Sequence, residues 1–154
     1  MRVRFWGLCL LACVAPIRGA WGGGLEPSAP SQLLEIRTFG TPCSAAGSIA
    51  LDLRTLKDGS TIIGYALPAK QVAVIRSVRF DAATTAATSV TVFLETAGNF
   101  LSYVEGISDA AGRFEGTFTF DPGVAVSNLA NFCVRTQTGG SIAATANGFL
   151  AKDR

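Results

Sequence analysis

The stretch that most constrains the fold is residues 67–80, LPAKQVAVIRSVRF. Val72, Val74, Val78 and Phe80 occupy even positions, so an extended backbone would place their side chains on one face. The residues between them are mostly polar or small. β-Branched and aromatic residues at this density suit a pleated, half-buried surface. The stretch therefore predicts a central strand of an all-β domain.

Two neighbouring residues break this alternation. Ile75 is apolar on the polar side, and Arg76 is charged on the apolar side. One interpretation is a β-bulge, which would turn the strand so that Ile75 lies inside and Arg76 outside. The other is a ligand site, in which the Arg76 guanidinium binds a carboxylate or sulfate inside a groove. The bulge is favoured, because bulges commonly re-aim side chains.

Eight to ten short strands are predicted along the chain, with no amphipathic helix longer than a turn or two. They cover residues 32–39, 48–56, 61–67, 68–80, 89–96, 100–107, 113–121, 129–137 and 142–150. Hairpin turns are predicted at residues 57–60, 97–99 and 138–141, and a further turn at 121–123. Short strands separated by turns are typical of a sandwich or a barrel. We expect an antiparallel two-sheet β-sandwich with jelly-roll-like topology, and an immunoglobulin-like sandwich as second choice.

The cleanest alternation lies in residues 113–121. It places Phe114, Phe118 and Phe120 on one face and polar residues on the other. We expect these three rings to form an apolar layer against the valines of residues 67–80.

The N-terminus has the features of a signal peptide. A positively charged start precedes an apolar run at residues 5–17, and small residues follow it. This run is shorter than the roughly 20 residues of a spanning helix. Cleavage after Gly22 best places small residues at the cleavage site.

An alternative is a lipoprotein, because residues 10–13 (LLAC) resemble a lipobox ending at Cys13. The expected organisation is a signal peptide at 1–22, a flexible linker at 23–31, one β-domain at 32–151 and a charged tail at 152–154.

Loss of the leader changes the net charge. Three of the 13 basic residues lie in residues 1–22, whereas all 11 acidic residues lie beyond them. The mature chain would carry ten basic and 11 acidic residues, a net charge of about −1. The mature chain would then lack the net positive charge that attracts a protein to nucleic acid or to an anionic membrane.

Two of the four cysteines leave with the leader, so Cys43 and Cys133 remain. In an oxidising compartment two such cysteines most often pair. The alternative is two buried free thiols. Cys133 lies off the face of Phe132, so the disulfide is expected in the outer layer or at a sheet edge.

The chain contains no histidine. The commonest general base and the commonest metal ligand are therefore absent, and no cofactor is expected. Carboxylates remain as catalytic candidates, since glycosidases use a pair of them. Glu95, Glu105 and Glu115 are spaced along the expected strands, but each occupies the polar phase, where solvated charges belong.

Four residues are candidates for contact with a ligand. Arg76, Arg79 and Arg135 are arginines in otherwise apolar or neutral strands, and Tyr103 is an aromatic residue in a predicted strand. Tyrosine and arginine suit a sugar or protein surface, although both tryptophans lie in the leader.

Residues 67–78, LPAKQVAVIRSV, resemble the V-P-A-G-K-x-L-V-I-x-x-V strand of uncharacterised secreted bacterial β-sandwich proteins. The resemblance implies an exported bacterial β-domain and no particular activity. We therefore expect a secreted or periplasmic, non-enzymatic module that binds a protein or glycan at the cell envelope. The runner-up is a carboxylate-dependent enzyme acting on a polysaccharide. A third alternative is a subunit of an assembly, with a homo-oligomer among the options, whose residues 22–39 add as a strand to a neighbour.

Overall fold

The structure is a computed structural model, and it describes residues 33–43, 48–56, 58–97, 99–137 and 139–153. The predicted signal peptide, its cleavage site, the alternative lipid anchor at Cys13 and the linker all lie outside these residues. They therefore stay predictions from the sequence.

Antiparallel strands make up most of the described chain, and these ranges contain no α-helix. The strands are β1 (Leu33–Pro42), β2 (Ile49–Thr55), β3 (Thr61–Ile62), β4 (Gln71–Ala83), β5 (Ser89–Thr96), β6 (Asn99–Ile107), β7 (Arg113–Val126), β8 (Phe132–Thr136) and β9 (Ser141–Lys152). A short 3-10 turn, η2 (Leu129–Asn131), precedes β8. The predicted all-β class is confirmed. The strand predicted at 61–67 is reduced to Thr61–Ile62, because Tyr65 bonds instead to the carbonyl of Asp52 and packs against the core.

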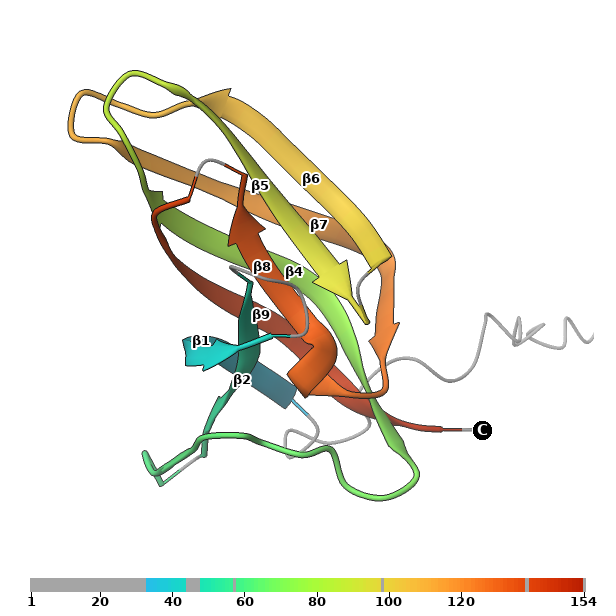
Figure 1. Ribbon diagram of the computed structural model, residues 1–154. Helices are drawn as coiled ribbons and strands as arrows, with labels where there is room; N and C mark the ends of the chain where they lie inside the picture. Colours follow the sequence, from blue (N-terminus) through green and yellow to red (C-terminus); the bar gives the residue numbers. More distant parts are fainter. Residues whose placement is uncertain (1–32, 44–47, 57, 98, 138, 154) are drawn as a thin grey trace, which may run out of the picture.

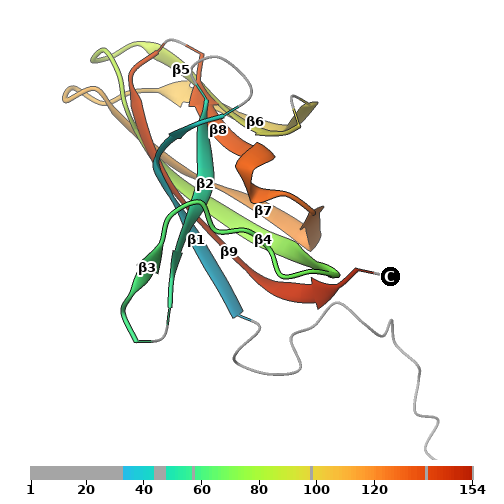
Figure 2. The ribbon, with the colours of Figure 1, turned by 60° about the horizontal axis from the view of Figure 1, so that its bottom comes forward.

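A single sheet contains all nine strands, in the order β6-β5-β8-β2-β1-β9-β4-β7, with β3 paired to β2. The sheet curls round until its two edge strands, β6 and β7, approach each other (Figures 1 and 2). The form is thus nearly closed and barrel-like, and the two separate sheets of a jelly-roll-like or immunoglobulin-like sandwich are not confirmed. The predicted hairpin at 138–141 is wrong, because β2 and β1 lie between β8 and β9.

Two long ladders hold β4 in the interior of the sheet. Against β9 the pairing runs from Gln71 opposite Lys152 to Ala83 opposite Ser141, and β7 pairs on the other side. The prediction that β4 is a central strand is therefore correct. It extends three residues beyond the predicted end at Phe80.

Arg76 lies at a β-bulge, as the sequence favoured. The register of β4 shifts between Ile75 and Ser77 against both neighbouring strands. Ile75 is fully buried and Arg76 is exposed. The bulge reverses the side-chain phase, so Val72 and Val74 do not share the core face with Val78, as the unbroken alternation had predicted. They belong instead to a small outer cluster with Phe149 and Ala151.

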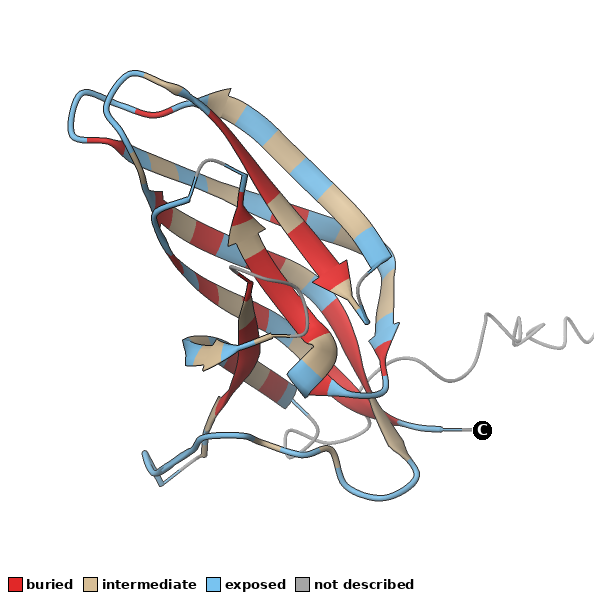
Figure 3. Cartoon of the chain, viewed as in Figure 1, coloured by how far each residue is buried: buried red, intermediate tan, exposed pale blue. Residues whose placement is uncertain are grey.

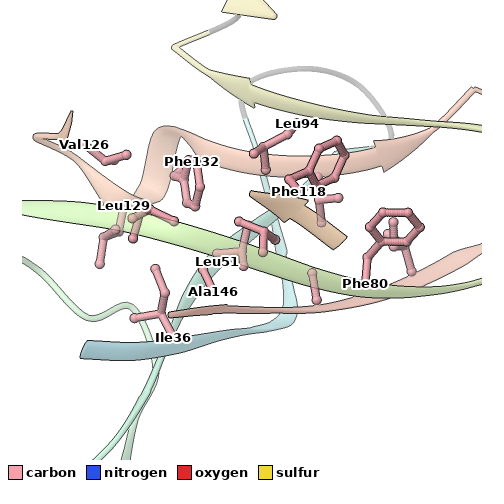
Figure 4. Packing of buried hydrophobic residues seen from close by; sticks show 14 of the residues in the cluster. Ile36, Leu51, Phe80, Leu94, Phe118, Val126, Leu129, Phe132 and Ala146 are labelled. Carbon is pink, nitrogen blue, oxygen red and sulfur yellow. The ribbon is translucent and has the colours of Figure 1, made fainter. Parts of the chain in front are cut away.

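The core lies inside the curled sheet. Buried residues alternate with exposed ones along the strands (Figure 3), and the largest buried side chains meet in the middle (Figure 4). Phe118 is opposite Val78 and its ring lies 5.3 Å from that of Phe80. The expected layer is confirmed for Phe118, which is 3% exposed, whereas Phe114 and Phe120 are only partly buried.

β7 continues past the turn predicted at 121–123. Pairing of β7 with β4 stops after Thr119 and resumes at Val124, so four residues of β7 lie opposite the single bulged residue Arg76. The proline and its neighbours are accommodated as an irregularity within the strand, since Pro122 has no N–H to give to a ladder. The strand then ends at Val126 and leads through η2 into β8.

The curled sheet stays open on one side, between β6 and β7. These strands are consecutive in sequence, and the turn at residues 108–112 joins them, yet no ladder links them in the described chain. Near this turn the ring of Phe114 lies over Gly106, where a Cβ atom would stand 2.4 Å from the ring. Away from the turn the strands separate (Figure 2). We call this opening, bounded by the free edges of β6 and β7, the seam.

Candidate functional site

Three side chains form a row across the outer face of β8, β5 and β6. Phe93 in β5 lies opposite Tyr103 in β6 on one side and opposite Arg135 in β8 on the other. Its neighbours Val92 and Leu94 are fully buried in the core, so Phe93 points outward. Directly opposed residues of antiparallel strands share a face. Two of the four predicted ligand residues, Tyr103 and Arg135, are thus brought together.

Phe100 extends this row into a cluster. It lies opposite Glu95, two residues along β5 from Phe93, and its ring centroid is 5.2 Å from that of Phe93. The Tyr103 ring lies 6.4 Å from Phe93. Phe100 is 63% exposed and Tyr103 is 61% exposed, so both rings are open to solvent. We call Phe93, Phe100, Tyr103 and Arg135 the aromatic face.

A buried ion pair supports the aromatic face from below. The Glu95 side chain is 3% exposed, and its Oε1 accepts a hydrogen bond of 2.7 Å from Nε of Arg135. The hydroxyl of Ser48 lies 3.4 Å from Oε2. A buried carboxylate requires such partners, because an unpaired charge away from water is costly. Glu95 therefore fixes the position of Arg135.

Arg135 also stacks on two rings. Its Cζ atom lies 4.5 Å from the ring centre of Phe93 and 5.4 Å from that of Phe100, within the range of cation–π attraction. Its Nη1 and Nη2 atoms have no hydrogen-bond acceptor within the described ranges. The guanidinium is thus held by its Nε edge and by both neighbouring rings.

Arg79 lies elsewhere, on the outer face of β4 opposite Thr145 and Thr117. Its guanidinium is 3.4 Å from Glu115, and its side chain is 74% exposed. It borders a shallow depression of about 450 Å³ that is floored by the small residues of β9. Four strands separate β4 from β5 in the sheet, so Arg79 does not join the aromatic face.

Arg76 is also apart from the aromatic face. The bulge turns it outward, and its guanidinium lies 5.7 Å from the ring of Phe149. The structure therefore agrees with the bulge interpretation of Arg76, whereas its role as a ligand residue stays a prediction. The four predicted residues fall into one pair and two separate positions.

Cys43 and Cys133 form the predicted disulfide, with their Cα atoms 6.2 Å apart. Phe132 and Val134 face the core, so Cys133 faces outward between them, as predicted. β8 is an interior strand, and the bridge therefore lies in the outer layer and not at a sheet edge. Cys133 is opposite Glu95, which places the disulfide next to the ion pair.

The three glutamates of the sequence analysis lie on three different strands, β5, β6 and β7. Glu95 is buried and bonded to Arg135, and Glu115 lies on β7 beside Arg79. Glu105 is opposite Thr91, four residues along β5 from Glu95, a separation of about 13 Å. In the described part of the chain no three acidic or cysteine side chains gather where a metal ion could be held.

Among the described residues, Asp58, in the turn between β2 and β3, is the one whose pKa is clearly shifted. The hydroxyl and the backbone N–H of Ser60 donate hydrogen bonds to its Oδ1 at 2.6 and 3.0 Å. These bonds favour the charged carboxylate and lower the pKa of Asp58 below its usual value. The pair stabilises the turn between β2 and β3, where Gly59 adopts positive φ.

Phe93 and Phe100 were missed in the sequence. The signal for Phe93 was present, since it stands in the strand predicted at 89–96 between two apolar residues, Val92 and Leu94, which an extended backbone turns to the opposite face. The position of Phe100 beside Phe93 was not predicted, because the register between β5 and β6 shifts at Glu95 and no pattern of residues indicates such a shift.

Comparisons with protein-family models, with curated proteins and with solved structures found no match. Among the described residues, no helix has the length and hydropathy needed to cross a membrane. The residues themselves must therefore carry any functional argument.

Proposed function

We propose that this chain is an exported, non-enzymatic binding module that contacts a protein partner through the aromatic face. The observation that carries the proposal is the pair of rings, Phe100 and Tyr103, each more than 60% exposed on one strand. Large exposed rings side by side mark interaction surfaces more often than scattered apolar residues do.

The composition of the face favours a protein. Tyr, Phe and Arg are enriched where proteins contact one another, and Tyr and Arg commonly supply most of the binding energy. Glu95 and the Phe93 ring hold Arg135 in one position, so binding would cost little side-chain entropy. The free Nη atoms of Arg135 would pair with a carboxylate of the partner.

Export is supported by the leader-like N-terminus and by the disulfide, since disulfides persist in oxidising compartments. Mass spectrometry of the secreted protein is expected to find an N-terminus near Gly23. A diacylated Cys13 peptide in the membrane fraction would establish the lipoprotein instead.

The partner surface is tested by site-specific photocrosslinking in the producing cells. A benzoylphenylalanine residue at position 103 is expected to crosslink to a protein, whereas the same residue at position 119, exposed on β7, is expected not to. The crosslink at 103 should be lost when Phe100→Ala is added.

A glycan array distinguishes the main alternative. The purified domain is expected to bind no glycan through this face. Binding of a glycan that Phe100→Ala and Tyr103→Ala abolish would refute the choice of a protein partner. Equal crosslinking at positions 103 and 119 would refute the face itself.

A further inference from the structure

The seam exposes two free strand edges to the same space. β6 is paired only with β5, and β7 only with β4, so the other edge of each strand has backbone N–H and C=O groups without a ladder partner in the described chain. Free edges readily pair with another chain, and most proteins protect them. Within the described ranges, neither edge is covered by another strand.

The seam is bounded at both ends. At one end the turn at residues 108–112 is fixed by Asp109, whose side chain accepts hydrogen bonds from the N–H groups of Ala111 and Arg113 at 2.8 and 2.7 Å. At the other end the chain leaves β7 through η2, and Asn131 accepts a bond from Ala97 in the β5–β6 turn at 3.0 Å. The opening is therefore bounded by β6 and β7 along its sides, by the turn at 108–112 at one end and by η2 at the other.

Apolar side chains line the seam from inside and are incompletely buried. The core-facing residues of the interior strands β4, β5 and β8 are at most 1% exposed, apart from the polar Thr136. By contrast β6 has no buried residue. On β7 the core-facing residues Phe118 and Val126 are buried. The other apolar residues of the two edge strands that pack against the core are only partly buried: Leu101, Val104, Phe114, Phe120 and Val124. The hydrophobic core thus reaches solvent along the seam, which costs stability unless something covers it.

Each edge also carries an acidic side chain without an ion-pair partner among the described residues. These are Glu105 on β6 and Asp121 on β7, and both are exposed. A second copy of this chain would bring its own acidic edge against them, and like charges on neighbouring strands repel. The charges therefore favour a basic occupant over another copy.

We propose that the seam binds an extended segment of a partner protein as an added strand. The backbone of the segment would pair with the free edges of β6 and β7. Its apolar side chains, at every second position, would cover Leu101, Val104 and Val124. A lysine or arginine at an outward position would meet Glu105 or Asp121. This site goes beyond the aromatic face, because it uses backbone edges and inward side chains, so either proposal can fail without the other.

A random dodecapeptide library panned on the purified domain tests the proposal. Enriched peptides are expected to alternate apolar and polar residues, with at least one lysine or arginine among the polar ones. By hydrogen exchange, a synthetic copy of the commonest peptide should slow amide exchange in β6 and β7 while leaving the already paired β9 unchanged.

Three variants distinguish the sites. Reversing both charges, Glu105→Lys with Asp121→Lys, should weaken peptide binding about tenfold without lowering the melting temperature, because both side chains are exposed. The pair Val104→Thr with Val124→Thr keeps side-chain shape and should weaken binding of the same peptide. Tyr103→Ala should leave peptide binding unchanged.

Four outcomes would overturn the proposal. They are the absence of enriched peptides, enrichment without alternation, binding that only Tyr103→Ala removes, and a dimer that protects the β6 and β7 amides without any peptide.

Discussion

Removing Arg135 should destabilise the fold much more than removing its ion-pair partner Glu95. The two side chains make the same hydrogen bond, but their surroundings differ. The Glu95 side chain is 3% exposed, whereas that of Arg135 is 24% exposed. In Arg135→Leu the buried carboxylate keeps only the distant hydroxyl of Ser48. In Glu95→Leu the guanidinium still stacks on Phe93 and Phe100 and reaches water.

The expected magnitudes follow from this difference. Leaving a buried charge without its partner costs about 3–5 kcal/mol, so Arg135→Leu should lower the free energy of unfolding by that amount. Loss of the two ring contacts adds about 1 kcal/mol. Glu95→Leu removes a charge-assisted hydrogen bond to a half-solvated group and should cost about 1–2 kcal/mol. The double variant should lower the free energy of unfolding by less than the sum of the two single variants, because it leaves no buried charge without a partner.

Urea unfolding at pH 7 measures these three variants against the parent chain, with equal m values as the condition for comparing them. Glu95→Gln is the matched control, because its amide oxygen can still accept the Arg135 bond. If Glu95→Leu costs as much as Arg135→Leu, or if the two costs simply add, then Glu95 is not a buried charge held by Arg135. The aromatic face would then lack its support.

Three further outcomes are expected. Phe118→Ala should cost about 4 kcal/mol in a urea melt, because the ring is buried against Phe80, while Thr119→Ala on the outer face should cost less than about 1 kcal/mol; a greater loss for the threonine variant would mean that β7 is out of phase. Reduction of the disulfide, which closes a loop across 90 positions, should cost about 4 kcal/mol, and thiol labelling of both cysteines in the native protein would contradict the bridge. By NMR titration, the carboxyl of Asp58 should titrate at lower pH than in Ser60→Ala. Because the pKa of Asp58 is lowered in the folded chain, its bonds to Ser60 stabilise the fold at pH values above the ordinary pKa of Asp. This stabilisation is lost as the pH falls through the lowered pKa. An Asp58 titration midpoint that Ser60→Ala leaves unchanged would refute the role of Ser60.

The alternation of apolar and polar residues within a strand predicted which of its side chains are buried. The alternation in residues 113–121 placed Phe118 inside, and Phe118 is buried. The conflict at Ile75 and Arg76 predicted a bulge, because burying the charge would have cost more than one irregular position in a ladder.

Long-range features were not predictable in the same way. The pairing of strands distant in sequence decides that residues 138–141 join non-neighbours and that Arg79 and Arg135 lie on different parts of the sheet. The predicted face of Val72 and Val74 was wrong because the bulge at Arg76 reverses the alternation between the residues before it and those after it. The sequence does not say which of these two groups has its even-numbered side chains in the core.

The pairing of the two ends of the domain has a consequence for how the chain is made. β1 near the start is joined to β9 at the end, with Leu33 opposite Phe149 and Arg37 opposite Thr145, and β9 in turn holds β4. Until β9 has been synthesised, β1 and β4 lack the strand that connects them, and the sheet remains in two incomplete halves. Contacts between such distant positions also form slowly. A nascent chain would therefore lack its closed sheet until the residues of β9 (Ser141–Lys152) have left the ribosome.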